Sequence, residues 1–309
     1  MSDTWPKPLN PVSGPMRADK VEGAALGMGQ WGEALQGLNA DGYVPPDMMT
    51  ALTLFLLGNQ PRDPAKKQAI PGAAGGVAGG VWVRERYTIH RPLLQAEKFS
   101  VEGHSMGRHV HKGRRYGTTQ SATSDEQGRA VASNVTTGLL AYKVEEGLQD
   151  VLEGIAPDNV DAPTPDWTSA ASNPHTEVLK AVSIGDVFGG YEVVMGLGLM
   201  KARDTKNPDN PIHSDPELAK KAGLSKPIAG GAHVLAFGLE VLMSKLGRQS
   251  LLHGTHFDIR WKTPVYADAT MVPQATCIDK SDDRCVFEVR TILADDALAM
   301  IAVVTIPLV

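Results

Sequence analysis

The chain has 309 residues, of which 42% are hydrophobic and 21% charged, so it can bury a sizeable core and is too apolar to be disordered. Its 30 lysines and arginines against 35 aspartates and glutamates give a formal net charge of -5, which offers no basic excess for a nucleic-acid partner. The longest apolar run, Ala297–Val309, is interrupted by Thr305 and Pro307 and is too short to span a bilayer, and the N-terminus shows no secretory signal, so we expect a soluble, cytoplasmic protein.

The first predicted element is a helix that is apolar on almost every side. Pro45 and Pro46 precede the run Met48–Leu57, and Gly58 follows it. Proline before a helix and glycine after it are ordinary stop signals, and a helix that is apolar all round must be buried. Alternating strands are expected after it, at Arg86–Pro92, Phe99–His104, Tyr116–Ser124 and Val131–Leu140.

The segment 145–177 divides the chain. It holds eight acidic residues, four prolines and no lysine or arginine, a composition typical of an exposed linker. We therefore predict a first half of residues 1–144, a linker of residues 145–177 and a second half of residues 178–309.

The second half repeats the pattern of the first. An apolar strand is expected over Tyr191–Met200, then a short helix that Ser214 or Asp215 caps, and then a second buried helix over Gly231–Leu246. Strands are expected after it at Asp258–Pro264, Thr270–Ile278, Cys285–Leu293 and Ala299–Leu308. A buried helix followed by antiparallel strands, repeated twice, predicts the α+β class.

No metal site is expected from the cysteines. Cys277 and Cys285 bracket a polar turn, and no histidine lies close to them in the sequence. In a reducing cytoplasm we expect two half-buried thiols rather than a disulfide.

The sharpest local pattern precedes the second buried helix. It reads Asn-Pro-Ile-His-x-Asp over residues 210–215 and, after the short helix, Pro-Ile-Ala-x-Gly over residues 227–231. This pattern resembles the MaoC-like (R)-specific enoyl-CoA hydratase/dehydratase family, and the duplicated helix-and-strand pattern extends the resemblance over most of the chain. The resemblance implies a double hotdog fold, in which two tandem hotdog repeats form one continuous antiparallel sheet around buried central helices.

The resemblance also implies an activity and its residues. The family hydrates 2-enoyl-CoA thioesters to 3-hydroxyacyl-CoA, or runs the reverse dehydration, and needs no cofactor because the thioester activates the substrate. The resemblance assigns the role of catalytic histidine to His213 and a substrate-binding role to Asn210. The family's catalytic aspartate normally lies five residues before the histidine, where this chain has Pro208. Asp209 and Asp204 are the remaining candidates, and Asp209 is favoured because only a tight turn and Ile212 separate it from His213.

The start of the second buried helix is the expected binding site for the thioester oxygen. A backbone N–H in the first turn suits the negative charge that this oxygen gains, and Gly231 lets the thioester approach the backbone. Gly230, at the preceding position, is also expected to contact the substrate, and it stands where the family usually has histidine. His233 is either a further substrate-binding residue or a satisfied core histidine.

The first half is expected to shape the acyl pocket without catalytic residues. Met48, Met49 and Ala51 are small or flexible side chains that suit a long or bulky acyl chain. The partner expected is therefore an acyl-CoA thioester, bound by a homodimer. Two alternatives stay open: a non-catalytic acyl-CoA-binding protein on a decayed hydratase scaffold, and a hotdog acyl-CoA thioesterase.

A basic patch in the first half allows a second contact with the substrate. It contains three histidines and four cations, which are His104, Arg108, His109, His111, Lys112, Arg114 and Arg115. It is either a solvated hairpin tip or a contact for the phosphates of coenzyme A.

Overall fold

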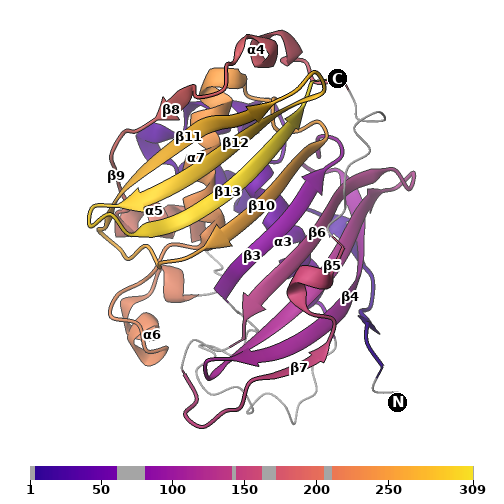
Figure 1. Cartoon of the computed structure of the whole chain (residues 1–309), viewed down its shortest axis with the longest axis vertical. Helices are drawn as coiled ribbons and strands as arrows, with labels where there is room; N and C mark the ends of the chain where they lie inside the picture. Colours follow the sequence, from indigo (N-terminus) through magenta and orange to yellow (C-terminus); the bar gives the residue numbers. More distant parts are fainter. Residues whose placement is uncertain (1–3, 61–80, 141–143, 162–171, 205–210, 309) are drawn as a thin grey trace.

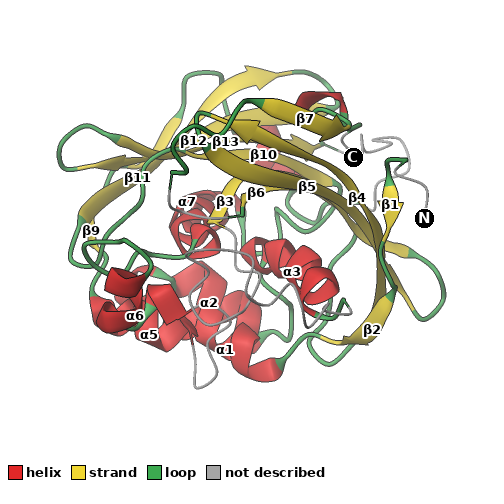
Figure 2. Cartoon of the chain, turned by 90° about the horizontal axis from the view of Figure 1, so that it is seen from below, coloured by secondary structure: helices red, strands yellow, loops and turns green. Residues whose placement is uncertain are grey.

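The computed structural model describes residues 4–60, 81–140, 144–161, 172–204 and 211–308. Over these residues the strands form one antiparallel sheet of 13 strands (Figure 1). The longer helices gather on the concave side of this sheet (Figure 2). The α+β class predicted from the sequence is therefore confirmed.

Each half of the chain contributes four long strands. In the first half they are β3 (Val81–Ile89), β4 (Lys98–His111), β5 (Arg114–Asp125) and β6 (Ala130–Leu139). In the second half they are β10 (Thr255–Trp261), β11 (Thr270–Lys280), β12 (Arg284–Leu293) and β13 (Leu298–Pro307).

The two halves meet in the middle of the sheet. The strand order is β4-β5-β6-β3-β10-β13-β12-β11, so β3 and its counterpart β10 are neighbours. They pair antiparallel with Arg86 opposite Asp258. The second half thus repeats the strand order of the first in reverse, as expected of two tandem repeats joined in a double hotdog fold.

Short strands extend the sheet at its edges. β1 (Lys7–Pro8), β2 (Val12–Pro15) and β7 (Val151–Gly154) pair with β4, and β8 (Val187–Gly189) and β9 (Val193–Val194) pair with β11. β7 lies within the predicted linker, so part of that segment packs against the first half. The division of the chain at residues 144 and 178 stays a prediction.

The helices differ in length between the two halves. The central helix of the second half is α7 (Gly231–Leu246, 16 residues), whereas the first half has the 3-10 turn η2 (Pro46–Met49) and α3 (Thr50–Gly58, 9 residues). The remaining helices and turns are α1 (Ala18–Leu26), η1 (Gly29–Trp31), α2 (Glu33–Ala40), η5 (Pro157–Asn159), α4 (Thr176–Ala181), α5 (Leu197–Asp204), η6 (Pro211–His213) and α6 (Pro216–Lys221). Within the described ranges no helix has the length and apolar character needed to cross a membrane.

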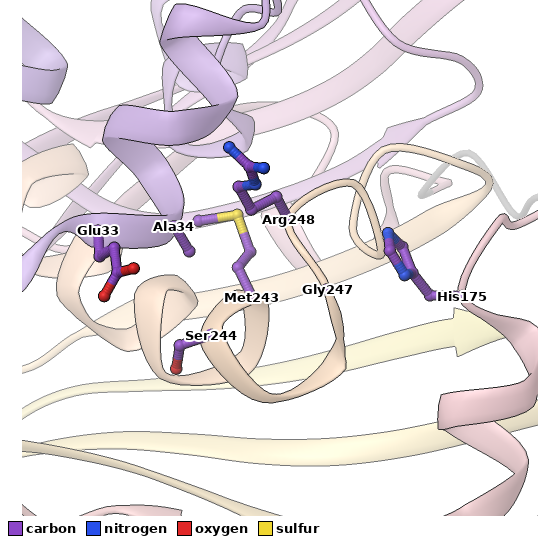
Figure 3. Close-up of a pocket in the computed structure, with 7 residues that line it drawn as sticks. All are labelled: Glu33, Ala34, His175, Met243, Ser244, Gly247 and Arg248. Atoms are coloured by element: carbon purple, nitrogen blue, oxygen red, sulfur yellow. The ribbon is translucent and has the colours of Figure 1, made fainter.

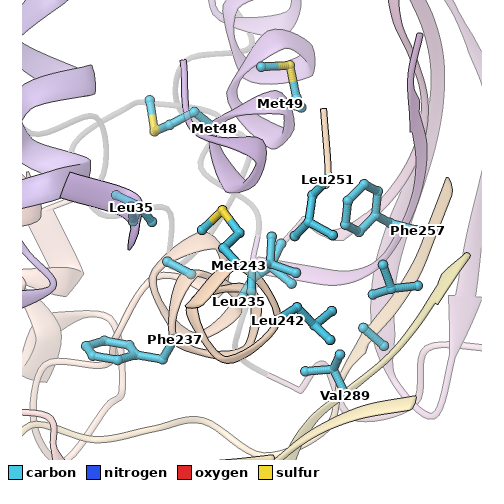
Figure 4. Packing of buried hydrophobic residues seen from close by; sticks show 14 of the residues in the cluster. Leu35, Met48, Met49, Leu235, Phe237, Leu242, Met243, Leu251, Phe257 and Val289 are labelled. Carbon is cyan, nitrogen blue, oxygen red and sulfur yellow. The ribbon is translucent and has the colours of Figure 1, made fainter. Parts of the chain in front are cut away.

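Helix α7 is buried on nearly all sides, as its apolar sequence predicts. Its glycine Gly238 lies against the sheet, where a Cβ atom would come within 2.7 Å of Val289, so the helix packs closer than a larger residue would permit. Met48 and Met49 of the first half lie across from Met243 of α7 in the same cluster (Figure 4). One hydrophobic core therefore runs through both halves.

The inner face of the first half carries a buried polar network instead of a purely apolar lining. The Glu85 Oε1 atom accepts hydrogen bonds from Asn134 Nδ2 and Thr136 Oγ1, both at 3.0 Å. The Thr136 hydroxyl also lies 3.3 Å from the Thr53 hydroxyl of α3. The Thr53 hydroxyl in turn lies 3.2 Å from the Ser121 hydroxyl. All five side chains are buried, so α3 rests on the sheet through hydrogen bonds.

The strand expected over Tyr191–Met200 is wrong. Only Val193–Val194 is extended, and α5 begins at Leu197. The spacing of Leu197 and Met200 places both on one helical face, where Met200 is buried and Leu197 packs against the core. The residues that lead toward the motif are therefore helical, and Asp204 is the last residue of a helix.

Both cysteines are buried free thiols, as expected. Burial raises the pKa of the Cys285 thiol to about 11, and the neighbouring Cys277 adds to this effect. The thiol is therefore protonated and unreactive at neutral pH.

Candidate functional site

His213 is placed by the turn η6 and a small apolar cluster. Ile212 packs with Ala219 of α6, with Ala222 just after it and with Ile228, and the Ile228 amide donates to the Ile212 carbonyl at 3.3 Å. Asp215 caps α6, because its Oδ1 accepts from the amides of Glu217 and Leu218. The turn that carries His213 is thus held on both sides.

The imidazole of His213 is oriented by one backbone contact. Its Nδ1 lies 2.7 Å from the carbonyl oxygen of Ile228. A carbonyl only accepts, so Nδ1 carries the proton and the neutral ring keeps its lone pair on Nε2. Burial lowers the pKa of His213, the nearby Asp204 raises it, and Lys20 and Arg203 lower it further. The net effect is a lowered pKa, so the ring is neutral at pH 7.

Gly230 lies beside the free face of this ring. A Cβ atom at this position would be 3.8 Å from Nε2 of His213. A side chain at this position would therefore begin in van der Waals contact with the imidazole. Its absence leaves the Nε2 side without that neighbour.

Asp204 approaches His213 from the end of α5. Its Oδ2 accepts a hydrogen bond from the hydroxyl of Ser214, the residue after His213. Its carbonyl oxygen accepts from Lys20 Nζ at 3.4 Å. Ser214 was one of two candidate caps for α6; its hydroxyl instead ties the carboxylate of Asp204 to the histidine turn.

The other two motif residues, Asp209 and Asn210, lie outside the described residues. The structure describes α5 up to Asp204 and resumes at Pro211, where η6 begins. The roles of Asp209 as catalytic carboxylate and of Asn210 in substrate binding stay predictions.

Gly231 begins α7, as expected, but it has a packing role as well. A Cβ atom there would lie 2.9 Å from the indole of Trp261, whose Nε1 donates to the Gly231 carbonyl at 3.0 Å. The first amides of a helix have no partner within it, and the helix dipole is positive at this end. The start of α7 can therefore stabilise an oxyanion.

His233 is held in the core rather than exposed toward a ligand. It is 1% exposed, and its Nε2 donates to the Gly27 carbonyl at 2.8 Å. Burial and the nearby Arg203 lower the pKa of His233 to about 3, so the ring is neutral. This is the environment of a satisfied core histidine, and a direct contact with substrate stays a prediction.

A buried ion pair next to the site was not predicted. Arg203, the residue before Asp204, pairs with Asp47 Oδ2 at the start of the first half's helix. No role was expected for Asp47, which lies between Pro46 and the apolar run Met48–Leu57. The only sequence feature that marks Asp47 is its position beside an apolar run. This feature does not identify Arg203 as its ion-pair partner.

The basic patch is partly neutralised by the acidic residues that follow it. His111 contacts Asp150 at 3.0 Å, and Arg115 contacts Glu145 at 2.9 Å. His109 stacks on Tyr116 with ring centroids 4.7 Å apart. These contacts are those of a paired hairpin tip, and a role in phosphate binding stays a prediction.

A cavity of about 450 Å³ lies at the opposite end of α7 (Figure 3). It is lined by Glu33, Ala34, His175, Met243, Ser244, Gly247 and Arg248. None of the predicted site residues lines it. The cavity is therefore separate from the site at the start of α7.

Residues 208–296 match the family model described as MaoC like domain. A search of curated proteins finds no match to this sequence. The match includes His213, Gly230, Gly231 and His233 and begins after Asp204.

Solved structures resemble the chain over almost its whole length. A MaoC-like dehydratase has a TM-score of 0.68 and 15% identity, covering 96% of each chain. The full-length peroxisomal multifunctional enzyme type 2 of Drosophila melanogaster has a TM-score of 0.63 and 17% identity, over 96% of this chain and 48% of that one. A conserved hypothetical protein of Mycobacterium tuberculosis, described as having a double hotdog fold, has a TM-score of 0.61 and 13% identity, over 96% of this chain and 93% of that one. Similarity at these identities establishes the double hotdog fold.

Proposed function

The second half of this chain carries a MaoC-like domain in a double hotdog fold, and on that premise we propose that the protein hydrates 2-enoyl-CoA thioesters to (R)-3-hydroxyacyl-CoA or catalyses the reverse dehydration. The observation that carries the proposal is the fixed tautomer of His213. Its Nδ1–H is engaged by Ile228, and its Nε2 lone pair is available as a proton acceptor.

Asp204 is the described carboxylate that best completes the site. It lies close enough to His213 to act on its pKa, and Ser214 orients it. We propose that His213 and Asp204 share one water molecule. Between them they take a proton from this water and return one to the α-carbon, while the hydroxyl adds to the β-carbon.

The start of α7 supplies the stabilising groups for the thioester oxygen. This oxygen gains negative charge as water adds, and the amide of Gly231 sits at the positive end of a 16-residue helix. Gly230, with no side chain, leaves room for the thioester beside the imidazole. We therefore assign the oxyanion contact to the first turn of α7.

We propose that the first half forms the pocket for a long or bulky acyl chain. Its central helix α3 has 9 residues against the 16 of α7, and it is preceded by Met48 and Met49 in the shared core. A shorter helix covers less of the inner face of its sheet, and methionine side chains adapt readily to different chain shapes.

One set of substrates decides between the proposed hydratase activity and its two alternatives. The protein is incubated with crotonyl-CoA and with longer 2-enoyl-CoAs. Loss of enoyl absorbance without release of thiol supports hydration, whereas free thiol indicates a thioesterase. Binding with neither change indicates an acyl-CoA-binding protein. Oxidation of the product by an (S)-specific 3-hydroxyacyl-CoA dehydrogenase would contradict the (R) assignment.

A further inference from the structure

A buried ion pair joins the two halves directly beside the proposed site. Asp47, at the start of the first half's helix, is 0% exposed, and its partner Arg203 on α5 is 12% exposed. Arg203 also makes a longer contact with the Ala24 carbonyl of α1 at 3.5 Å. Arg203 also packs closely on Gly27, the residue after α1, where a Cβ atom would lie 2.5 Å from the Cβ of Arg203. The guanidinium of this α5 residue therefore lies between η2 and α1.

The charge of Arg203 reaches the site. Arg203 precedes Asp204, and its positive charge lowers the pKa of both His213 and His233. A guanidinium stays charged at all ordinary pH values and binds carboxylates in preference to other acceptors. Without Asp47, this buried cation would need another carboxylate, and Asp204 is its neighbour in the chain.

We propose that Asp47 is a positioning residue for the second-half site, which binds Arg203 so that the guanidinium does not pair with the Asp204 carboxylate. Because its side chain is 0% exposed, Asp47 acts through Arg203. This inference rests on the proposed function, in which Asp204 works with His213. It gives the first half a part in catalysis that is separate from shaping the acyl pocket.

The kinetic test compares two variants and a matched control. Asp47→Asn removes the charge that holds Arg203, and we expect kcat on a 2-enoyl-CoA to fall at least about tenfold while KM changes less than about twofold. Asp47→Asn/Arg203→Gln also removes the guanidinium, so we expect kcat to recover most of this loss. The control is Asp125→Asn, since Asp125 is likewise buried and paired with arginines, Arg91 and Arg129, but at the far end of β5. It should lower Tm and leave kcat unchanged.

A second measurement does not depend on turnover. The pKa of His213 is followed by NMR titration of its ring, with His213→Gln to assign the signals. The charged groups that act on this ring are Asp204, Lys20 and Arg203. In Asp47→Asn the positive charge is unopposed or neutralises Asp204, and either effect lowers the His213 pKa. In the double variant the pKa should return toward the wild-type value.

The two measurements separate this inference from the proposed function. If the wild-type protein hydrates no enoyl-CoA, the proposed function fails, and the titration still tests the coupling. An unchanged His213 pKa in folded Asp47→Asn overturns the inference. A double variant no more active than Asp47→Asn also overturns it, because the loss would then come from disrupted packing.

Discussion

The Nδ1 of His213 and the carbonyl oxygen of Ile228 lie 2.7 Å apart, although 15 residues separate them in the sequence. The intervening residues form α6 and the loop that leads into α7. This loop is held from its other side by the Ala229 amide, which donates to the Val265 carbonyl at 2.8 Å. The tautomer of His213 is therefore set by backbone that also positions the start of α7.

Replacing His213 should remove most of the activity. We expect His213→Ala to lower kcat for enoyl-CoA hydration by at least about 100-fold, the usual contribution of a positioned acid or base. Initial rates from the enoyl absorbance measure the effect, and circular dichroism checks that the variant is folded. A folded His213→Ala protein with wild-type turnover would contradict the site assignment.

The pH dependence of the reaction should report the lowered pKa of His213. Burial lowers this pKa below its ordinary value near 6.5, so the neutral ring persists into mildly acidic solution. We expect the acidic limb of kcat/KM that belongs to this group to lie below pH 6.5 and to be absent in His213→Gln. If the acidic limb of kcat/KM lay above pH 7 and disappeared in His213→Gln, the pKa of His213 would be raised instead of lowered.

Asp204 and Asp209 are the two candidates for the catalytic carboxylate. Replacing each with asparagine distinguishes between them. Asp204 is tied to the histidine turn through Ser214, so we expect Asp204→Asn to lower kcat by at least about 100-fold and Asp209→Asn to lower it less. KM should change little in both, since neither carboxylate holds the acyl chain. The opposite order of effects would assign the role to Asp209. Ser214→Ala should reproduce part of the Asp204→Asn loss.

The sequence predicted the sheet well because its strands follow the alternation of buried and exposed residues. It also predicted α7, since Gly231–Leu246 is apolar on almost every side. It failed over Tyr191–Met200, where a short apolar stretch fits strand and helix equally well. The helix there is decided by packing of Met200 and Leu197 against the core, which local sequence does not reveal.

The candidate site was predictable only where residues are close in sequence. His213, Gly230 and Gly231 lie within one local pattern, and the family's spacing drew attention to Asp209. The link between Asp204 and Ser214 depends on the direction in which α5 ends. The pair of Asp47 and Arg203 joins residues 156 apart. Such a contact follows from the packing of the two halves and leaves no periodic signal.

Glu240 should stabilise the fold from inside α7. Its two carboxylate oxygens accept from the amides of Ala34 and Leu35 at the start of α2, both at 2.8 Å. Glu240→Ala leaves two buried amides without an acceptor, so we expect the free energy of unfolding to fall by at least about 2 kcal/mol. Denaturant unfolding measures this loss. Glu177→Ala, at a carboxylate whose side chain is 86% exposed, should change the same quantity by less than about 0.5 kcal/mol.

Glu85 should make the stability of the protein depend on pH. It is 0% exposed, its Oε2 has no hydrogen-bond partner among the described residues, and burial raises its pKa from 4.5 to about 7. The folded state thus favours the protonated acid. The stability that Glu85 contributes is complete below pH 4.5 and is lost as the pH rises to about 7, where the folded carboxyl ionises.

The size of this effect follows from the two pKa values. At about 1.4 kcal/mol per pKa unit, the loss amounts to about 3 kcal/mol. Glu85→Gln keeps the side-chain shape and removes the ionisation, so subtracting its free energy of unfolding from that of the wild type cancels the other titrating groups. We expect this difference to fall by about 3 kcal/mol between pH 4.5 and pH 8, and then to level off. A difference that stays constant over this range would mean that Glu85 ionises in the folded protein as readily as in the unfolded chain.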